Sequence, residues 1–372
     1  MNGGAPNIEA IQKCIGNPID NARIGNRRIA AVIGENPSVY SKSPALWNAA
    51  FATLGLEATY VPLDISASRL PELISALRAS ERLLGFNVTV PHKVRVTEYL
   101  DELDSDAVRV QAVNTVTRTA DGRLIGHNTD GTGFIESILK PQPGQSKSFI
   151  ESLASLNVLL IGAGGSARAI AFQVADQLTG GRLLICNRTW MHAASLADEI
   201  RGAGNQAQAI TEDELPHWVL QAGLVINSTI KGQGGTRALA DGSVMSLDAY
   251  SALAAAHPVA VPRSEYGKTD SQDDKLKALQ ADITRNNQSS LALAYSIPKD
   301  VAFYDLIYFP EETVFLRHAR MTGHKIMNGK PMIICQAARG LFDHICNAEL
   351  QARGLNTRET YDRITETMYR AW

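Results

Sequence analysis

The chain has little of what marks a secreted, membrane-spanning or disulfide-built protein. Its 372 residues include four cysteines that form no Cys-x-x-Cys pair, namely Cys14, Cys186, Cys335 and Cys346. Such isolated cysteines indicate reduced thiols rather than disulfides or zinc ligands. No apolar run approaches the roughly 18 to 20 residues needed to cross a membrane. The N-terminus has no basic stretch followed by an apolar one, so no signal peptide is expected. These absences favour a cytoplasmic protein.

Strongly charged segments are also missing. The net charge is −2, the isoelectric point is about 6.5, and Lys and Arg form no run. Neither a nucleic acid nor a membrane surface is therefore an expected partner. The remaining composition, 45% hydrophobic and 20% charged, is ordinary for a globular protein. The length exceeds one typical domain and indicates two or three.

Strand and helix patterns alternate through the first part of the chain. Strands are predicted at 28–33, 59–63, 84–90, 115–119 and 124–128, and helices at 43–54, 70–79, 94–103 and 133–139. The last two strands are joined by the turn Asp121–Gly122. This order predicts an α/β domain over residues 1–139 with a mostly parallel sheet covered by helices. The Pro- and Gly-containing segment 140–147 indicates a boundary.

A second α/β unit follows, which we expect to span residues 148–330. Its predicted strands are 157–161, 183–186, 224–227 and 301–308, with helices at 167–178 and 192–201. Residues 233–295 lack apolar periodicity, and their polar part, 266–290, suggests a solvated insertion with helix at 275–282. Helices are expected again at 312–322 and 331–347, within a C-terminal segment 331–372.

A glycine-rich turn follows the first strand of this second unit. It reads Ile161-Gly162-Ala163-Gly164-Gly165-Ser166-Ala167-Arg168 and leads into a helix. In this strand–turn–helix context, the pattern G-x-G-x-x-A indicates a dinucleotide-binding, Rossmann-type domain. Gly162 allows the tight turn, Gly164 allows the backbone to approach a pyrophosphate, and Ala167 allows close helix packing. The helix N-terminus offers N–H donors to the phosphates.

The end of the next strand bears on the choice of coenzyme. NAD-binding domains usually carry an acidic residue there, which bonds the ribose 2′-hydroxyl. Here the chain has Asn187-Arg188-Thr189 and no acid. A guanidinium can bind a 2′-phosphate, whereas a carboxylate would repel it. NADP is therefore predicted, with NAD less favoured; the alternative is that Arg188 is only a solvated loop residue.

Several further motifs occur in an order that resembles the shikimate dehydrogenase family. They are Ser41-Lys42-Ser43-Pro44, Asn87-Val88-Thr89-Val90-Pro91-His92-Lys93, Ala112-Val113-Asn114-Thr115, Gly126-His127-Asn128-Thr129-Asp130-Gly131, Asn227-Ser228-Thr229, Tyr304-Asp305-Leu306-Ile307-Tyr308, and Gln336-Ala337. Together with the glycine-rich turn, they cover most of the chain. Each motif is modest by itself, but the ordered set is specific.

The resemblance implies a substrate domain, a Rossmann-type NADP domain and C-terminal helices that pack on the first. It implies reversible NADPH-dependent reduction of 3-dehydroshikimate to shikimate, in aromatic amino acid biosynthesis, without a metal. The implied catalytic pair is Lys93 and Asp130. The implied substrate-binding residues are Ser41 and Ser43 for the carboxylate, and Asn87, Thr89, Asn114, Gln336 and Tyr308. Cofactor contacts would come from residues 162–167, Asn187, Arg188, Thr189 and Thr229. A monomer or homodimer is expected.

The residue types of the implied pair suit the chemistry. Hydride addition to a ketone leaves an alkoxide that must take a proton, and the Lys93 ammonium can donate one. Asp130 would orient the lysine. The alternatives are that Lys93 is a surface lysine and that Asp130 caps the following helix. His92 and His127, next to these motifs, are interpreted as structural.

The motifs depart from the family pattern in four places. Asn227-Ser228-Thr229-Ile230, Tyr308-Phe309-Pro310 and Gly329-Lys330-Pro331-Met332 replace the usual sequences, and His192 stands where a basic residue often follows. These changes concern substrate and coenzyme preference. A quinate, aminoshikimate or other cyclitol dehydrogenase is therefore one alternative. A non-catalytic NADP-sensing protein is another, although a sensor would have no need to keep both Lys93 and Asp130.

Overall fold

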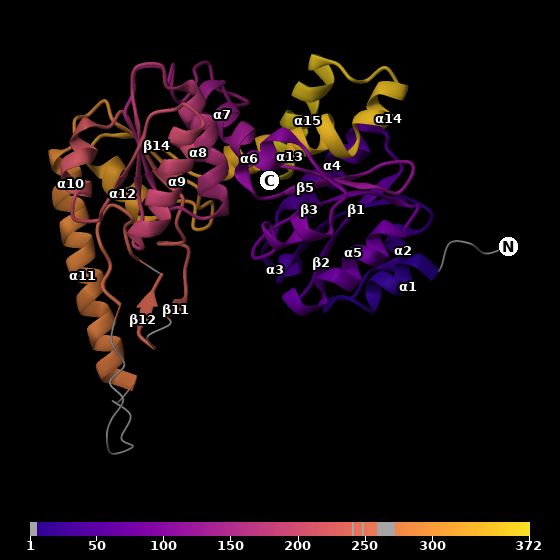
Figure 1. The fold of residues 1–372 in the computed structure, drawn as a ribbon, viewed down its shortest axis with the longest axis horizontal. Helices are drawn as coiled ribbons and strands as arrows, with labels where there is room; N and C mark the ends of the chain where they lie inside the picture. The colour runs from indigo at the N-terminus through magenta and orange to yellow at the C-terminus, as the bar shows by residue number, and fades with distance from the viewer. Residues whose placement is uncertain (1–5, 240–241, 248, 259–271) are drawn as a thin grey trace. The chain divides into compact units, whose positions relative to one another are not determined.

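The computed structural model describes residues 6–239, 242–247, 249–258 and 272–372. The chain forms two compact units (Figure 1). The first combines Met1–Lys147 with Met332–Trp372, and the second is Ser148–Pro331. The C-terminal segment thus returns to the first unit. No helix among the described residues is long and apolar enough to span a membrane.

The first unit is built on a six-stranded sheet in the order β2-β1-β3-β5-β6-β4. Its strands are β1 (Arg28–Gly34), β2 (Ala58–Asp64), β3 (Leu83–Val88), β4 (Glu102–Leu103), β5 (Thr115–Arg118) and β6 (Leu124–His127). Strands β2, β1 and β3 are parallel, as is β4 to β6, whereas β5 is antiparallel to both of its neighbours. The sheet is mixed because the tight turn at Gly122, with a positive φ of 88°, reverses the chain between β5 and β6.

Both faces of this sheet are covered, as the alternation along β1 shows. Ala30 and Val32 belong to one apolar cluster and Ala31 and Ile33 to the other. The helices of this unit are α1 (Pro6–Gln12), α2 (Asn21–Ile24), α3 (Pro37–Tyr40), α4 (Ser43–Leu54), α5 (Leu70–Arg78), α6 (Ser105–Val110), α7 (Asp130–Leu139), α13 (Lys330–Arg339), α14 (Asn347–Ala352) and α15 (Arg358–Ala371). The first cluster includes residues of α4, α13 and α15, and the second residues of α1 and α5.

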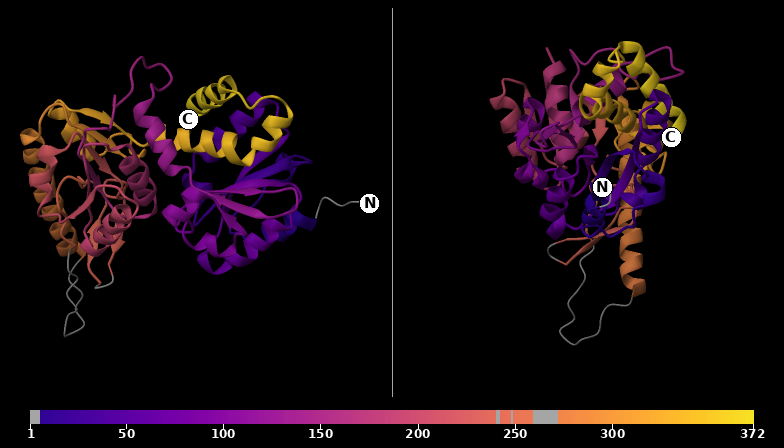
Figure 2. Two further views of the ribbon diagram at one scale, coloured as in Figure 1. Left: turned by 45° about the horizontal axis from the view of Figure 1, so that its top comes forward. Right: turned by 90° about the vertical axis from the view of Figure 1, so that its right-hand side faces the viewer.

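The C-terminal helices complete the core of the first unit. Helix α15 packs against α4, and both views of Figure 2 show the C-terminal segment, in yellow, beside the first unit's sheet. Buried side chains of α15, among them Ile364 and Met368, contribute to the cluster that also holds Trp47 and Phe51. Residues more than 300 positions apart therefore share one apolar core.

The helix predicted at 94–103 is wrong. Residues Arg95–Tyr99 form a short 3₁₀ turn, after which Glu102–Leu103 pairs with β6. The apolar spacing of Val96, Leu100 and Leu103 imitates a helical face but serves this turn and the strand. Asp104 then accepts a hydrogen bond from the Ala107 amide over 2.7 Å and begins α6 as its N-cap.

The second unit contains an entirely parallel sheet in the order β14-β13-β10-β7-β8-β9. Its strands are β7 (Val158–Ile161), β8 (Leu183–Cys186), β9 (Ala207–Ile210), β10 (Leu224–Asn227), β13 (Ala302–Asp305) and β14 (Lys325–Met327). Numbered along the chain, the order is 6-5-4-1-2-3, that of the doubly wound dinucleotide-binding fold. The reversal lies between β7 and β10, where such folds bind their ligand. The predicted α/β fold class is confirmed.

Helices flank this sheet, and a small hairpin lies outside it. The helices are α8 (Gly165–Gln177), α9 (Trp190–Gly202), α10 (Leu215–Trp218), α11 (Gln272–Ser296) and α12 (Val314–Met321), and the hairpin pairs β11 (Thr236–Ala238) with β12 (Val244–Ser246). The strands β9 and β14 and the helix α10 were not predicted, because each is short and carries little periodicity.

Within the insertion predicted at 233–295, the helix expected at 275–282 is confirmed as part of α11, but the prediction that the part 266–290 is solvated is wrong for one face of this helix. Helix α11 buries one stripe at intervals of four residues, formed by Asp282, Asn286, Ser290 and Ala294. The side chain of Asn286 makes four of the contacts on this stripe. It accepts from the Ser251 amide (2.8 Å) and donates to the carbonyls of Ser251, Ala254 and Ala255. The stripe is mostly polar, so its helical periodicity was invisible to a hydrophobic pattern. Residues 240–241, 248 and 259–271 of this prediction lie outside the described residues.

Candidate active site

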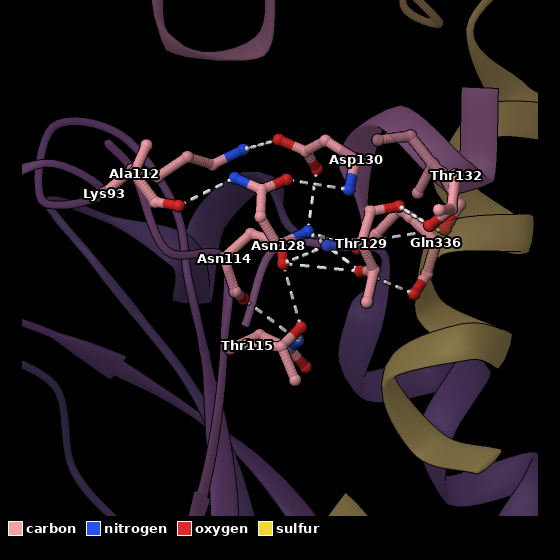
Figure 3. A network of polar contacts seen from close by, with 11 residues as sticks. Lys93, Ala112, Asn114, Thr115, Asn128, Thr129, Asp130, Thr132 and Gln336 are labelled. Carbon is pink, nitrogen blue, oxygen red and sulfur yellow. Dashed lines mark hydrogen bonds and ion pairs between the residues drawn. The ribbon is translucent and has the colours of Figure 1, made fainter. Parts of the chain in front are cut away.

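A polar network in the first unit joins Lys93 to Asp130. The Lys93 Nζ lies 2.5 Å from Oδ2 of Asp130, and Asn114 Nδ2 donates to the other oxygen, Oδ1, over 2.8 Å (Figure 3). The side chains of Lys93 and Asp130 are only 17% and 6% exposed. Both charged groups are therefore largely shielded from solvent, unlike a surface pair. The interpretation of Lys93 as a surface lysine is therefore ruled out.

The turn between β6 and α7 orients Asp130. Asn128 donates to the Ala112 carbonyl over 2.9 Å and accepts from the Asp130 amide over 3.1 Å. Thr129, not Asp130, occupies the N-cap position of α7, and its amide donates to Oδ1 of Asn114 over 2.9 Å. Asp130 is the first helical residue, and its carboxylate accepts from Asn114 and Lys93. The carboxylate is therefore directed at the lysine and does not cap the helix.

Asn87 connects this network to the start of α4. Its Nδ2 donates to the Asn114 carbonyl (3.1 Å) and to the Thr115 hydroxyl (3.0 Å), while its Oδ1 accepts from the Tyr60 hydroxyl over 2.7 Å. The Ser43 side chain hydrogen-bonds the same Tyr60 hydroxyl. Burial raises the pKa of Tyr60 well above its ordinary value, and the bond from Ser43 opposes that rise. Ser43 and Asn87 are thus joined through one buried phenol.

Sequence reasoning missed Tyr60, although one feature pointed to it. A tyrosine within a predicted buried strand needs a partner for its hydroxyl, and polar motifs lie on either side in the sequence. Lys42 is the N-cap of α4, and Ser43 is the first helical residue. The Ser43 amide donates to Oγ of Ser41 over 3.2 Å, which keeps both hydroxyls at the same helix start.

Gln336 brings the C-terminal segment into the same network. Its Oε1 accepts from Asn114 Nδ2 over 3.2 Å, and its carbonyl accepts from the Thr129 hydroxyl over 3.0 Å. Helix α13 approaches α7 this closely because Gly133 has no side chain. A Cβ added there would lie 2.6 Å from the Gln336 amide nitrogen. Thr89, in contrast, hydrogen-bonds Tyr40 and is not part of this network.

The glycine-rich turn of the second unit has the geometry a pyrophosphate requires. Gly162 has a φ of 116°, and a Cβ on it would lie 2.3 Å from Oγ of Ser228. Only glycine fits there. Gly164 is the N-cap of the 13-residue helix α8, and a Cβ on it would meet nothing within 4 Å. The amides at this helix start can therefore be approached by an anion.

Three loops of the second unit lie side by side at one edge of the sheet. Ile161 pairs with Cys186 on one side and with Asn227 on the other, so the turn after β7 lies between the loops after β8 and β10. Asn187 donates to the Thr189 carbonyl over 2.9 Å and shapes the second loop, in which Arg188 is exposed. The structure thus brings together all the predicted cofactor residues.

A buried carboxyl that was not predicted as functional supports the third loop. Oδ1 of Asp305 accepts from Asn227 Nδ2 (2.9 Å) and from the Ile307 amide (3.0 Å), and Oδ2 accepts from the Thr313 hydroxyl (2.6 Å). Asn227 in turn accepts from the Thr229 hydroxyl over 2.7 Å. Burial raises the pKa of Asp305 to about 7 against the opposing effect of these hydrogen bonds. Tyr308, which was predicted to bind substrate, lies three residues after Asp305 in the second unit.

These two arrangements define a class of protein. A doubly wound sheet with a glycine-rich turn at its reversal point binds a dinucleotide. A shielded Lys–Asp pair among neutral amides and hydroxyls can move a proton to or from a polyhydroxylated substrate. Together they define a two-domain nicotinamide-dependent dehydrogenase.

Comparison with known proteins places the chain within that class. Residues 32–116 match the shikimate dehydrogenase substrate binding domain, and residues 145–263 match shikimate / quinate 5-dehydrogenase. The shikimate dehydrogenase (NADP(+)) of Symbiobacterium thermophilum is 34% identical over 319 residues, which cover 84% of this chain and 87% of the relative. That of Lysinibacillus sphaericus is 41% identical over 202 residues, 54% of this chain and 68% of the relative. The chain belongs to the shikimate dehydrogenase family.

A solved structure agrees with this assignment. Shikimate 5-dehydrogenase from Thermus thermophilus, determined in complex with NADP(H) and shikimate, is 28% identical with a TM-score of 0.61. The match covers 93% of this chain and all of that one. The resemblance inferred from the motifs is confirmed.

Proposed function

We propose that this protein catalyses the reversible oxidation of shikimate to 3-dehydroshikimate with NADP⁺, releasing NADPH and a proton. The observation that carries the proposal is the shielded ion pair of Lys93 and Asp130, held from the far side by Asn114. The names of the relatives and the ligands of the Thermus thermophilus structure support it. The proposal also assigns the first unit to the substrate and the second to the dinucleotide.

Lys93 and Asp130 would handle the proton. In the direction of oxidation the substrate hydroxyl loses its proton to this pair, while hydride leaves the carbon that bears the hydroxyl. In reduction the Lys93 ammonium gives a proton to the developing alkoxide, and Asp130 holds the lysine in position through their contact. NADP⁺, when bound, supplies the hydride acceptor. Asp130 is oriented through Asn114 before substrate binds, so little reorganisation is needed.

The remaining polar groups of the first unit would hold the substrate. Ser41 and Ser43 present hydroxyls at the start of a 12-residue helix, α4, where a carboxylate is favoured. Substrate hydroxyls would be bound by side chains of the first unit that can both donate and accept, namely Asn87, Thr89, Asn114 and Gln336. A substrate that lacks one of these hydroxyls would leave a buried amide or hydroxyl of the protein without its hydrogen-bond partner. Such side chains therefore discriminate against it.

The second unit would hold the dinucleotide through its three adjacent loops. The amides at the start of α8 would bind the pyrophosphate, together with Ala163, Gly165, Ser166 and Ala167 of the turn. The exposed Arg188 would receive the 2′-phosphate, with Asn187 and Thr189 shaping its loop. Thr229, fixed through Asn227, would lie at the edge of this site.

Steady-state rates with a panel of substrates test the proposal directly. Shikimate and quinate should each be offered with NADP⁺ and with NAD⁺, and the ratios of kcat/KM compared. Shikimate with NADP⁺ should be the best of the four combinations. Quinate as the preferred substrate would make the protein a different cyclitol dehydrogenase. NADPH binding without turnover of either compound, in an enzyme shown to be folded, would instead indicate a sensor.

A further inference from the structure

Two histidines and an aspartate that this reaction does not use meet within the first unit. Asp104 precedes α6, His127 ends β6, and His344 lies in the π-helical turn Gly340–Ile345. His127 Nδ1 lies 2.7 Å from Oδ2 of Asp104. The rings of His127 and His344 are stacked, with centroids 3.9 Å apart. One donor atom from each of the three residues lies within 4.8 Å of the others.

Hydrogen bonds that involve the backbone fix the segment that carries each of these side chains. Oδ1 of Asp104 accepts from the Ala107 amide, and Oδ2 lies against His127. The His127 carbonyl accepts from the Asn114 amide over 3.1 Å within the sheet. His344 is placed by a wide helical turn that closes with the Cys346 amide on the Leu341 carbonyl at 2.9 Å. Turns of this π-helical kind occur frequently at functional sites.

The donor set has a definite coordination preference. Two imidazole nitrogens and one carboxylate oxygen are ligands that Zn²⁺ takes at about 2.0 to 2.2 Å in tetrahedral sites, often with water in the fourth position. Tetrahedral ligands at that range lie roughly 3.3 Å apart. The Asp104–His127 pair at 2.7 Å would therefore open slightly, and the His344 donor, within 4.8 Å, would move to that distance. Asp104 and His127 side chains are 30% and 13% exposed, which leaves room for such rotations and for solvent.

The surrounding charges permit a cation. The nearby guanidinium of Arg339 is neutralised by Glu136 at 2.8 Å and by Asp343 at 3.1 Å. All four cysteines are buried, so no exposed thiol competes for a soft metal. Among the residues that the structure describes, this is the one group of three such side chains with its donor atoms so close.

We propose that Asp104, His127 and His344 form a site for one Zn²⁺ ion, with water completing the coordination. The ion would join three segments that are separated by 23 and 217 positions along the chain. His127 directly precedes the turn of Asn128 to Asp130, so the ion would stabilise the segment that carries Asp130. It takes no part in hydride or proton transfer.

Metal binding to the full chain, freed of metal by a chelator, tests this site. Co²⁺ serves as a coloured probe and Zn²⁺ as its competitor. We expect one Co²⁺ per chain with the visible absorption of a tetrahedral ion, displaced by Zn²⁺, and a rise in Tm when Zn²⁺ is added. His344→Phe keeps a stacked ring and Asp104→Asn keeps a helix N-cap, yet each removes a ligand. Each should weaken Zn²⁺ binding by at least roughly tenfold and remove the rise in Tm.

His192→Phe, at an exposed histidine of the second unit, is the matched control and should bind Zn²⁺ as the wild type does. Equal affinity in wild type, His344→Phe and Asp104→Asn would overturn the site, and so would wild-type binding without a rise in Tm. If His192→Phe loses as much Zn²⁺ affinity as the two site variants, the binding is adventitious and the site is overturned. Should His344→Phe not fold, Asp104→Asn alone decides the outcome.

Discussion

Asn114 donates a hydrogen bond to Oδ1 of Asp130 over 2.8 Å, while Oδ2 of the same carboxylate pairs with Lys93. The two oxygens of one carboxylate are therefore assigned to different tasks. One fixes the orientation of the side chain, and the other holds the ammonium. The backbone of Asn114 is also bonded on both sides, to the amide of Val88 and to the carbonyl of His127. The geometry of the Lys–Asp pair is thus set by the centre of the sheet.

The close approach of α13 to α7 predicts a sensitive glycine. In Gly133→Ala the new Cβ would stand 2.6 Å from the Gln336 amide nitrogen, which belongs to backbone and cannot rotate away. We expect a loss of about 1 to 3 kcal/mol in the free energy of unfolding and a higher KM for shikimate, because Gln336 must move. Gly202→Ala, where a Cβ would meet nothing, is the control for both measurements. An unchanged Tm and KM in Gly133→Ala would refute the packing argument.

Arg188 is predicted to decide the coenzyme. Arg188→Asp should raise the KM for NADP⁺ by roughly 10- to 100-fold, since a charged hydrogen bond to phosphate is worth about 1.5 to 3 kcal/mol and the carboxylate adds repulsion. The KM for NAD⁺ should change little. Arg182→Asp, an exposed arginine just before the same strand, should alter neither. If wild type already prefers NAD⁺ in a direct comparison, the role of Arg188 is disproved.

Ser43 and Tyr60 are predicted to act on substrate binding. Ser43→Ala should raise the KM for shikimate with little change in kcat, because a carboxylate carries the same charge in the ground state and the transition state. Tyr60→Phe keeps the ring but removes the hydroxyl that joins Ser43 to Asn87. It should raise KM by a smaller factor. A fall in kcat at constant KM in either variant would contradict this assignment.

The buried carboxyl of Asp305 predicts how stability depends on pH. Its pKa is raised to about 7 in the folded chain from 3.8, so the unfolded chain releases this proton first. Stability is therefore greatest below about pH 4 with respect to this group and falls as pH rises toward 7, by up to ~4 kcal/mol. Asp305→Asn stays neutral. The Tm of wild type should fall relative to that of Asp305→Asn between pH 4 and pH 7; parallel curves would show that the carboxyl is not shifted.

The fold could be predicted from the sequence wherever a segment is dominated by one residue type or by one hydrophobic repeat. The apolar strands ending at Ile161, Cys186 and Asn227 could be recognised because both of their faces are buried, and the glycine-rich turn identified the kind of domain. Lys93 and Asp130 could be paired in advance only through the motifs of a family. Nothing in their spacing of 37 positions shows that a lysine and an aspartate will meet.

Other parts could not be predicted for physical reasons. Helix α11 buries Asp282, Asn286 and Ser290, whose stabilisation comes from hydrogen bonds to groups that no hydrophobic pattern records. Asp305 looks like any strand residue until its burial and its three donors are known. The cluster of His127 and His344 depends on a π-helical turn, and a single sequence has no marker for such a turn.

The proposed mechanism requires Lys93 to act in the transition state, and steady-state kinetics of Lys93→Ala with shikimate at saturating NADP⁺ tests this most directly. Circular dichroism should confirm that the variant is folded. We predict that kcat falls by at least about 10²-fold, the lower range for general acid–base catalysis, while the KM for shikimate changes little because the hydroxyl and amide contacts remain. A folded Lys93→Ala enzyme that keeps the wild-type kcat and loses only affinity would contradict the account and assign Lys93 to substrate binding.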